Sequence, residues 1–208
     1  MELIHNVFGV FQKGGPVMYV LLVCSFVVVA VAVERFLYYR DQGTDTKTLL
    51  TALVPALEKG EWNQALLLCR QTPGAAAHVA AQGIESYLKG SLYTESVLEG
   101  EASLAAARLR DHLNQLDMIV TLAPLLGLLG TVIGMIGSFS VLNLKAGQPL
   151  AITGGVGEAL IATAAGLTVA TAAMVVHSYF AHRLDSMITG LEEVGTVLVS
   201  YMRVEKRV

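Results

Sequence analysis

Charged residues are scarce in this sequence. Asp, Glu, Lys and Arg make up 15% of the 208 residues, whereas hydrophobic residues make up 54%. Soluble domains usually contain about 25% charged residues, so the composition excludes an ordinary globular protein. The net charge of −3 and the lack of a basic segment also argue against nucleic-acid binding.

Cysteine is also rare. Two cysteines, Cys24 and Cys69, are too few and too far apart for a disulfide framework. No His or Cys spacing is typical of a structural metal site, and no Ser-His-Asp, HExxH or paired-carboxylate pattern supports hydrolase chemistry. The sequence therefore predicts a protein that is not an enzyme and that has no metal and no cofactor.

The missing charge leaves three long hydrophobic runs. Residues 14–33, 118–144 and 159–182 contain no Asp, Glu, Lys or Arg, and the runs are 20, 27 and 24 residues long. Each is long enough to cross a ~30 Å hydrocarbon core as a helix that rises 1.5 Å per residue. No long β pattern is present, so we expect an all-α integral membrane protein with three spans, whose long helices extend into a cytoplasmic helical bundle.

The positions of Lys and Arg predict the orientation in the membrane. Of the 14 Lys and Arg, twelve lie in the stretch 34–117 or after the last hydrophobic run, and the other two are Lys13 and Lys145. The positive-inside rule then places the N-terminus outside and the C-terminus in the cytoplasm. The Ala30-Val31-Ala32 triplet resembles a signal-peptide cleavage site, but the poorly basic start and the long apolar run favour a retained span.

Seven segments follow from this pattern. They are a short outer N-terminus (1–15), span one (16–33), a cytoplasmic helical loop (34–117), span two (118–144), a short outer link (145–153), span three (154–182) and a cytoplasmic C-terminal helix (183–208). The expected outer segments are short, so most soluble residues should lie in the cytoplasm.

The cytoplasmic segments show helical patterns. Short helices are predicted at residues 45–59, 61–71 and 75–89, with interruptions at Pro55, Gly60, Pro73 and Gly90. A further helix over residues 94–117 should continue without a break into span two. In the tail, a stripe of residues recurs at helical spacing: Leu184, Ile188, Leu191, Gly195, Leu198 and Met202. This stripe predicts packing either within the chain or on a neighbouring subunit.

Small residues and one hydroxyl mark span two. Gly127, Gly130, Gly134 and Gly137 follow one another in steps of three or four residues, so they should share a helix face on which another backbone can pack closely. Thr131 adds a hydroxyl near the middle of the membrane. A lone membrane Thr commonly bonds its own helix, so Thr131 alone is weak evidence for function.

Span three contains an acidic residue, Glu158, together with Thr163 and Gly166. Apolar sequence precedes Glu158, which places it within the membrane or at its outer edge. An ionisable group there costs at least ~2–3 kcal/mol unless it is neutral, paired or hydrated, so a functional role is the first hypothesis. The alternative is a carboxylate that caps the outer end of the helix. The Gly154-Gly155-Val156-Gly157 segment predicts a turn.

These motifs together resemble the ExbB/TolQ/MotA family of proton-channel subunits. The resemblance is carried by residues 127–135 of span two and 158–167 of span three, and by Gly14 to Tyr19 and Glu34-Arg35 beside span one. It covers essentially the whole chain and is closest to the ExbB type. One departure is Thr171-Ala172, where the family often has Ile-Pro.

The resemblance implies a homopentamer in the bacterial inner membrane. Spans two and three would line a central pore that holds the spans of an ExbD/TolR-type partner with a membrane Asp. Thr131 and Thr163 match the pore threonines of the family, and Glu158 matches its membrane glutamate. The pore-lining spans would pack closely at five glycines: Gly127, Gly130, Gly134, Gly137 and Gly166. Proton flow would turn the partner, which pulls a TonB- or TolA-like protein.

The expected function is therefore a proton-channel stator subunit that energises TonB-dependent outer-membrane transport. A TolQ-type subunit of a Tol-Pal-like envelope machine shares this chemistry and differs in its partner. A non-conducting membrane scaffold is a further alternative, which predicts that neutralising Glu158 has no effect. Three spans without an inverted repeat argue against a secondary transporter.

Overall fold

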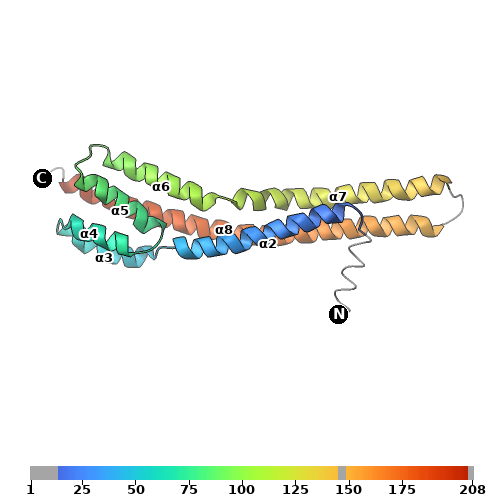
Figure 1. Ribbon diagram of the computed structural model, residues 1–208, viewed down its shortest axis with the longest axis horizontal. Helices are drawn as coiled ribbons and strands as arrows, with labels where there is room; N and C mark the ends of the chain where they lie inside the picture. Colours follow the sequence, from blue (N-terminus) through green and yellow to red (C-terminus); the bar gives the residue numbers. More distant parts are fainter. Residues whose placement is uncertain (1–13, 145–148, 206–208) are drawn as a thin grey trace. The chain divides into compact units, whose positions relative to one another are not determined.

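The computed structural model describes residues 14–144 and 149–205, and of these it describes residues 141–144 and 149–153 by their backbone alone. The helices of this part of the chain (Figure 1) are α2 (Val17–Gln42), α3 (Thr46–Glu58), α4 (Trp62–Gln71), α5 (Ala75–Leu88), α6 (Thr94–Arg110), α7 (Leu113–Leu144) and α8 (Pro149–Glu205). The predicted all-α fold is confirmed.

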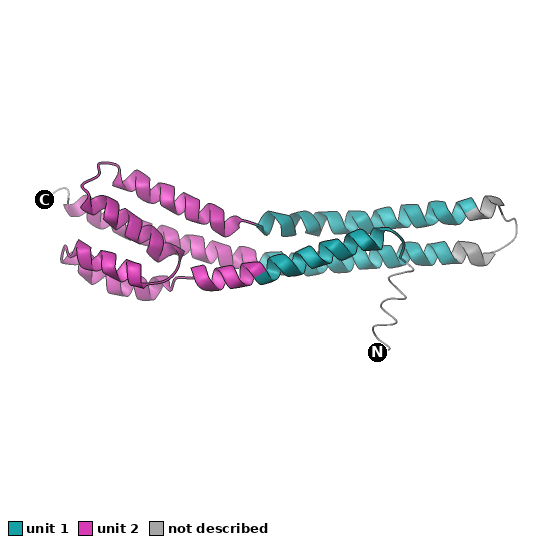
Figure 2. Cartoon of the chain, viewed as in Figure 1, with its two compact units in different colours: residues 1–33, 112–179 teal, residues 34–111, 180–208 magenta. Residues whose placement is uncertain are grey.

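The chain folds into two compact units, which are coloured separately in Figure 2. Unit 1 contains residues up to 33 and residues 112–179, and unit 2 contains residues 34–111 and 180–208. Three helical stretches of the described residues are long and apolar enough to cross a membrane. Their charge-free parts lie in unit 1, except for residues 180–182 at the end of the third run, which belong to unit 2. The chain is thus a multi-pass membrane protein.

The predicted short helices of unit 2 are confirmed as α3, α4 and α5. Asp45 caps α3, because its carboxylate accepts hydrogen bonds from the Thr48 backbone N–H (3.3 Å) and hydroxyl (2.7 Å). Pro55 was expected to interrupt this helix, but α3 continues through it. Proline removes one backbone donor, and both Pro55 and Thr51, whose carbonyl loses that donor, are exposed to solvent.

The expectation of one unbroken helix from residue 94 into span two is wrong. α6 ends at Arg110 and α7 begins at Leu113, and His112 between them has a positive φ of 64°. Side chains of α2 satisfy the carbonyls at the end of α6. The Tyr39 hydroxyl donates to Leu109 O at 2.7 Å, and the buried Arg35 guanidinium donates to Arg108 O at 3.3 Å.

α8 is one helix of 57 residues, so the predicted turn at residues 154–157 is absent. The helix of span three continues into the tail, as expected of a long helix that extends beyond the hydrophobic run. Of the expected outer link, residues 145–148 lie outside the described residues. In unit 2 the tail packs within the chain: Leu184, Leu191 and Leu198 are buried, and a Cβ added at Gly195 would lie 3.9 Å from Leu98 of α6. This favours the intrachain interpretation of the stripe.

Candidate ion pathway

Glycines bring the backbones of α7 and α8 into contact within unit 1. A Cβ added at Gly127 would lie 3.1 Å from both Ala162 O and the Thr163 Cα. One added at Gly134 would lie 3.1 Å from Gly155 O. At Gly130 it would lie 2.5 Å from the Ala162 Cβ. Three of the four glycines predicted to share a face of span two therefore lie against α8, as close packing of membrane helices requires.

Gly166 makes the reciprocal contact from α8. A Cβ there would lie 2.6 Å from Ala123 O and 2.9 Å from the Gly127 Cα. Both obstacles are backbone atoms, which cannot turn aside as a flexible side chain can. Gly137 differs from the other glycines of α7, because a Cβ at this position would meet nothing within 4 Å in the described part of the chain.

Thr163 links the two helices by a hydrogen bond. Its hydroxyl donates to Gly127 O at 3.1 Å, across the α7–α8 contact. Thr168 and Thr171 of the same helix instead donate to carbonyls one turn earlier in α8, both at 2.8 Å. Thr163 is thus held by tertiary structure, while its hydroxyl oxygen keeps the capacity to accept a hydrogen bond from water or a partner.

Thr131 bonds within its own helix. Its hydroxyl donates to Leu128 O at 2.6 Å, one turn earlier in α7. A self-bonded membrane hydroxyl is common and does not itself indicate a site. Thr131 directly follows Gly130, which packs on Ala162, so its position is fixed by the α7–α8 contact even though its hydrogen bond is local.

Glu158 lies inside α8 rather than at its start. The helix begins at Pro149, so Glu158 is more than two turns from the N-terminus. The favourable effect of a helix N-terminus on a carboxylate is confined to the first turn. The capping alternative for Glu158 therefore does not hold. The residue is partly buried, and its carboxylate lies against Gly15, in the turn that precedes α2.

The three predicted pathway residues do not form one cluster in a single chain. Thr163 follows Glu158 by five residues, which corresponds to a rotation of about 140° on a helix. Accordingly Thr163 faces α7, whereas Glu158 faces the beginning of α2. Within the part of the chain that the structure describes, no hydrogen bond joins Glu158 to Thr131 or Thr163. A continuous path between them requires water or groups from another chain.

Sequence reasoning missed the contact between Gly15 and Glu158. In the sequence, the glycine-proline segment before span one contributes only to the family resemblance. The sequence did contain a signal: Gly14-Gly15-Pro16 is a turn pattern placed directly before a hydrophobic helix. Nothing in that pattern could indicate which residue of another helix the turn touches.

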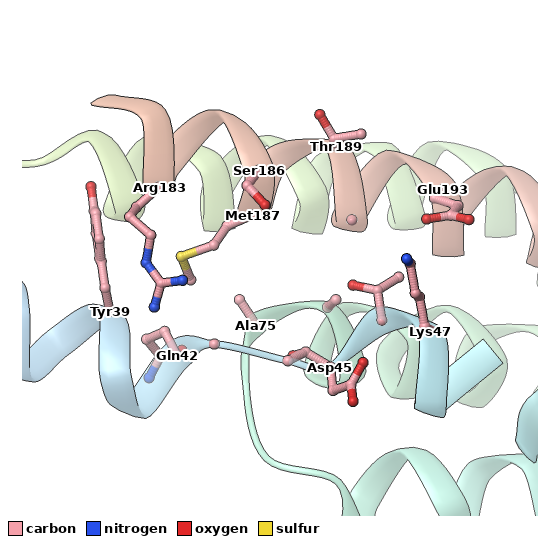
Figure 3. A pocket seen from close by; sticks show the side chains of 15 residues that line it. Tyr39, Gln42, Asp45, Lys47, Ala75, Arg183, Ser186, Met187, Thr189 and Glu193 are labelled. Atoms are coloured by element: carbon pink, nitrogen blue, oxygen red, sulfur yellow. The ribbon is translucent and has the colours of Figure 1, made fainter. Parts of the chain in front are cut away.

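Unit 2 contains a polar pocket of about 440 Å³, which lies between α8 and the ends of α2, α3 and α5 (Figure 3). Arg183 extends from α8 toward the end of α2, and Lys47 of α3 points toward Glu193. Asp45 is already used as the α3 cap, and the hydrogen bond from the Thr48 hydroxyl lowers the pKa of its carboxyl. Its charged lining residues are two cations, Lys47 and Arg183, and two anions, Asp45 and Glu193.

The positions of the His, Cys, Asp and Glu side chains show whether the described residues could hold a metal ion. Among residues 14–144 and 149–205, no group of three His, Cys, Asp or Glu side chains is arranged to hold a metal ion. The predicted pathway residues of unit 1 offer the hydroxyls of Thr131 and Thr163 and the carboxylate of Glu158. Hydroxyls orient water, and a carboxylate can take up and release a proton.

Comparison with known proteins identifies similar chains. Residues 72–193 match a sequence model described as the MotA/TolQ/ExbB proton channel family. The matched range includes Thr131, Glu158 and Thr163.

Individual relatives align over most of this chain. The putative biopolymer transport protein ExbB homolog of Methanothermobacter thermautotrophicus is 28% identical over 197 residues, which cover 92% of this chain and 70% of that protein. The putative biopolymer transport protein ExbB-like 1 of Synechocystis sp. is 35% identical over 179 residues (80% and 67%). The biopolymer transport protein ExbB of Xanthomonas campestris is 30% identical over 139 residues (64% and 55%).

Proposed function

Since the chain belongs to the MotA/TolQ/ExbB proton channel family, we propose that it is the stator subunit of an ExbB-type motor driven by the proton motive force. The relatives with the longest alignments are named as ExbB-type biopolymer transport proteins, which supports the ExbB type over the TolQ type. In this proposal the motor energises TonB-dependent transport across an outer membrane.

The proposal rests mainly on the position of the Glu158 carboxylate within α8. A carboxylate within a membrane-spanning helix costs ~2.5–3.5 kcal/mol and is normally retained for function. Here it lies beyond the first turns of α8 and is not a helix cap. Moving one charge through 100 mV releases ~2.3 kcal/mol, so repeated protonation of such a group can be coupled to motion.

The residues of unit 1 divide the work as follows. Glu158 takes up and releases a proton, and the hydroxyls of Thr131 and Thr163 orient the water that carries it. The glycines at the α7–α8 contact keep these helices at a fixed separation. A single carboxylate of this kind per chain leaves the second proton carrier to an ExbD/TolR-type single-span partner, held in the centre of a homopentamer lined by α7 and α8.

Orientation follows from the distribution of Lys and Arg. In the proposed arrangement the N-terminus faces the periplasm, while unit 2 and the C-terminus lie on the cytoplasmic side of the bacterial inner membrane. Glu158 then belongs to the outer half of α8, and the partner transmits its motion to a TonB-like protein in the periplasm.

Proton flux measures the proposal directly. The chain is reconstituted into liposomes with its co-expressed ExbD-type partner, and flux is followed with an internal pH dye under an imposed potential. Glu158→Gln and Thr163→Val should lower partner-dependent flux more than about tenfold, which corresponds to a barrier raised by more than about 1.4 kcal/mol. Thr189→Val is the control, since Thr189 lies beyond the hydrophobic run of α8 and its hydroxyl donates to a carbonyl of its own helix, Asp185 O, at 2.9 Å. Unchanged flux in Glu158→Gln would contradict the proposal and favour a non-conducting scaffold.

The identity of the co-purified partner separates the two motor types. Recovery of an ExbD-type protein together with a TonB-like protein supports the proposed role. Recovery of a TolR-type protein with a TolA-like protein would assign the same chemistry to a TolQ-type envelope machine.

A further inference from the structure

The turn that precedes α2 lies directly against the carboxylate of Glu158. A Cβ added to Gly15 would overlap Glu158 Oε1, and it would lie 3.3 Å from the Cδ and 3.7 Å from the Cγ of that side chain. The carboxylate of Glu158 therefore occupies the space that any other side chain at position 15 would need.

Gly15 is required for two separate reasons. Its φ of +72° lies in the left-handed region, which glycine adopts without steric cost. Gly90, between α5 and α6, has nearly the same φ of +70°, but a Cβ there would meet nothing within 4 Å. The two glycines share a backbone conformation, and only Gly15 has a carboxylate packed on its Cα.

The turn itself is anchored to unit 1. Gly14 is buried, and a Cβ at Gly14 would lie 2.8 Å from the Met18 sulfur and 3.2 Å from Ile161 of α8. The Met18 backbone N–H donates to Gly15 O at 3.2 Å, which closes the turn into α2. Because the turn contacts α8 one helical turn beyond Glu158, its backbone forms a fixed wall beside the carboxylate.

We infer that Gly15 is a positioning residue for Glu158: the bare Cα of the turn before α2 seats the carboxylate and covers one of its sides. This inference rests on the proposed role of Glu158 in proton transfer. With one side covered by backbone, a proton donor, water or partner group must reach the carboxylate from the opposite side, so the seat selects the direction of proton exchange.

Chemical labelling of the Glu158 carboxyl group tests this inference without a measurement of proton flux. The full-length chain in lipid nanodiscs is treated with a hydrophobic carbodiimide, and labelling of Glu158 is followed by mass spectrometry of its peptide. Three variants are compared with the unmodified chain: Gly15→Ala, Gly90→Ala and the double variant Gly15→Ala/Glu158→Asp. Partner-dependent proton flux is measured in parallel for each of them.

Gly15→Ala should expose the carboxyl and raise its labelling rate several-fold, while Gly90→Ala should leave it unchanged. The shorter Asp side chain vacates the space taken by the new methyl group. The double variant should therefore restore folded yield and thermal stability, relative to Gly15→Ala, toward the level of Gly90→Ala. The double variant tests the contact even if Gly15→Ala alone folds poorly. Both variants carry Ala at position 15 and so share the same backbone strain. A difference in stability between them therefore reports the contact with the side chain at position 158.

Equal labelling of Gly15→Ala and Gly90→Ala, or no recovery in the double variant, overturns the inference. The result also separates it from the proposed function. Changed labelling with flux unaffected by Glu158→Gln would keep the seat and reject the proton role. Unchanged labelling with flux abolished by Glu158→Gln would keep the proton role and reject the seat.

Discussion

At the scale of single residues, the thiol of Cys69 is buried away from water. Its side chain in α4 is 1% exposed, and burial raises the pKa of the thiol to about 11. Only the thiolate reacts with alkylating reagents, so Cys69 should resist iodoacetamide at pH 8 in the folded chain. The rate should rise with pH until about pH 11, and unfolding in denaturant should make the thiol react as an ordinary cysteine.

The measurement is the time course of alkylation in a Cys24→Ala background, read by mass spectrometry of the peptide that contains Cys69. The raised pKa of Cys69 also makes the stability of the folded chain depend on pH. The folded pKa is raised above the unfolded value, so the buried neutral thiol contributes its full stabilisation below the unfolded pKa of about 8.5 and loses it as the pH rises toward about 11. Fast labelling of the native chain at pH 8 would show that α4 opens readily.

Residues of the candidate pathway differ in how far sequence could predict them. The sequence alone is enough to propose a role for Glu158, because one carboxylate beside an uncharged run of 24 residues stands out. The contacts of Thr163 with Gly127 and of Gly15 with Glu158 could not be predicted from the sequence. Each depends on which helix faces which, and composition and periodicity carry no information about that choice.

At the scale of elements, Gly166 determines how closely α7 and α8 approach. Ala raises helix propensity by about 1 kcal/mol over Gly, but at position 166 its methyl group would collide with backbone atoms of Ala123 and Gly127. We expect Gly166→Ala to destabilise unit 1 by roughly 1–3 kcal/mol, as overpacking typically does. Thermal unfolding of the detergent-solubilised chain measures the change.

Gly137→Ala is the matched control on the partner helix. A Cβ at Gly137 meets nothing within 4 Å among the described residues, so the same substitution should be neutral or stabilising by up to about 1 kcal/mol. Opposite signs for the two variants would establish that contact with α7, rather than glycine content, governs stability. Equal effects would mean that the helices can separate to admit a methyl group.

Helix boundaries show why local signals were only partly sufficient. Gly60 and Pro73 end helices as predicted, whereas Pro55 lies within α3, on its exposed side. The break at His112 has no Gly or Pro to announce it. It is stabilised from another helix, by hydrogen bonds from Arg35 and Tyr39 to the end of α6. A boundary fixed by tertiary hydrogen bonds is invisible to a pattern read along one segment.

At the scale of the whole molecule, large apolar side chains of the spans remain exposed in a single chain. Phe26, Leu128 and Ile136 are 66%, 59% and 62% exposed, and they belong to unit 1. Lipid covers such surfaces, but the hydroxyls of Thr168 and Thr171 lie on an equally exposed side of α8 and are better suited to a hydrated interior. Assembly around a central pore would leave the apolar side chains in contact with lipid and place the hydroxyls of Thr168 and Thr171 toward water in the pore.

Native mass spectrometry of the full chain, released from detergent, tests that assembly. Five copies of the 22.1 kDa chain have a mass of about 110 kDa, and co-expression with an ExbD-type partner should add the mass of whole partner copies. Glu158→Gln should preserve this assembly, because it keeps the size of the side chain and leaves the glycines of the α7–α8 contact in place. A monomer or dimer that does not bind the partner would remove the central pore, and with it the route by which Glu158 could exchange protons with a second carboxylate.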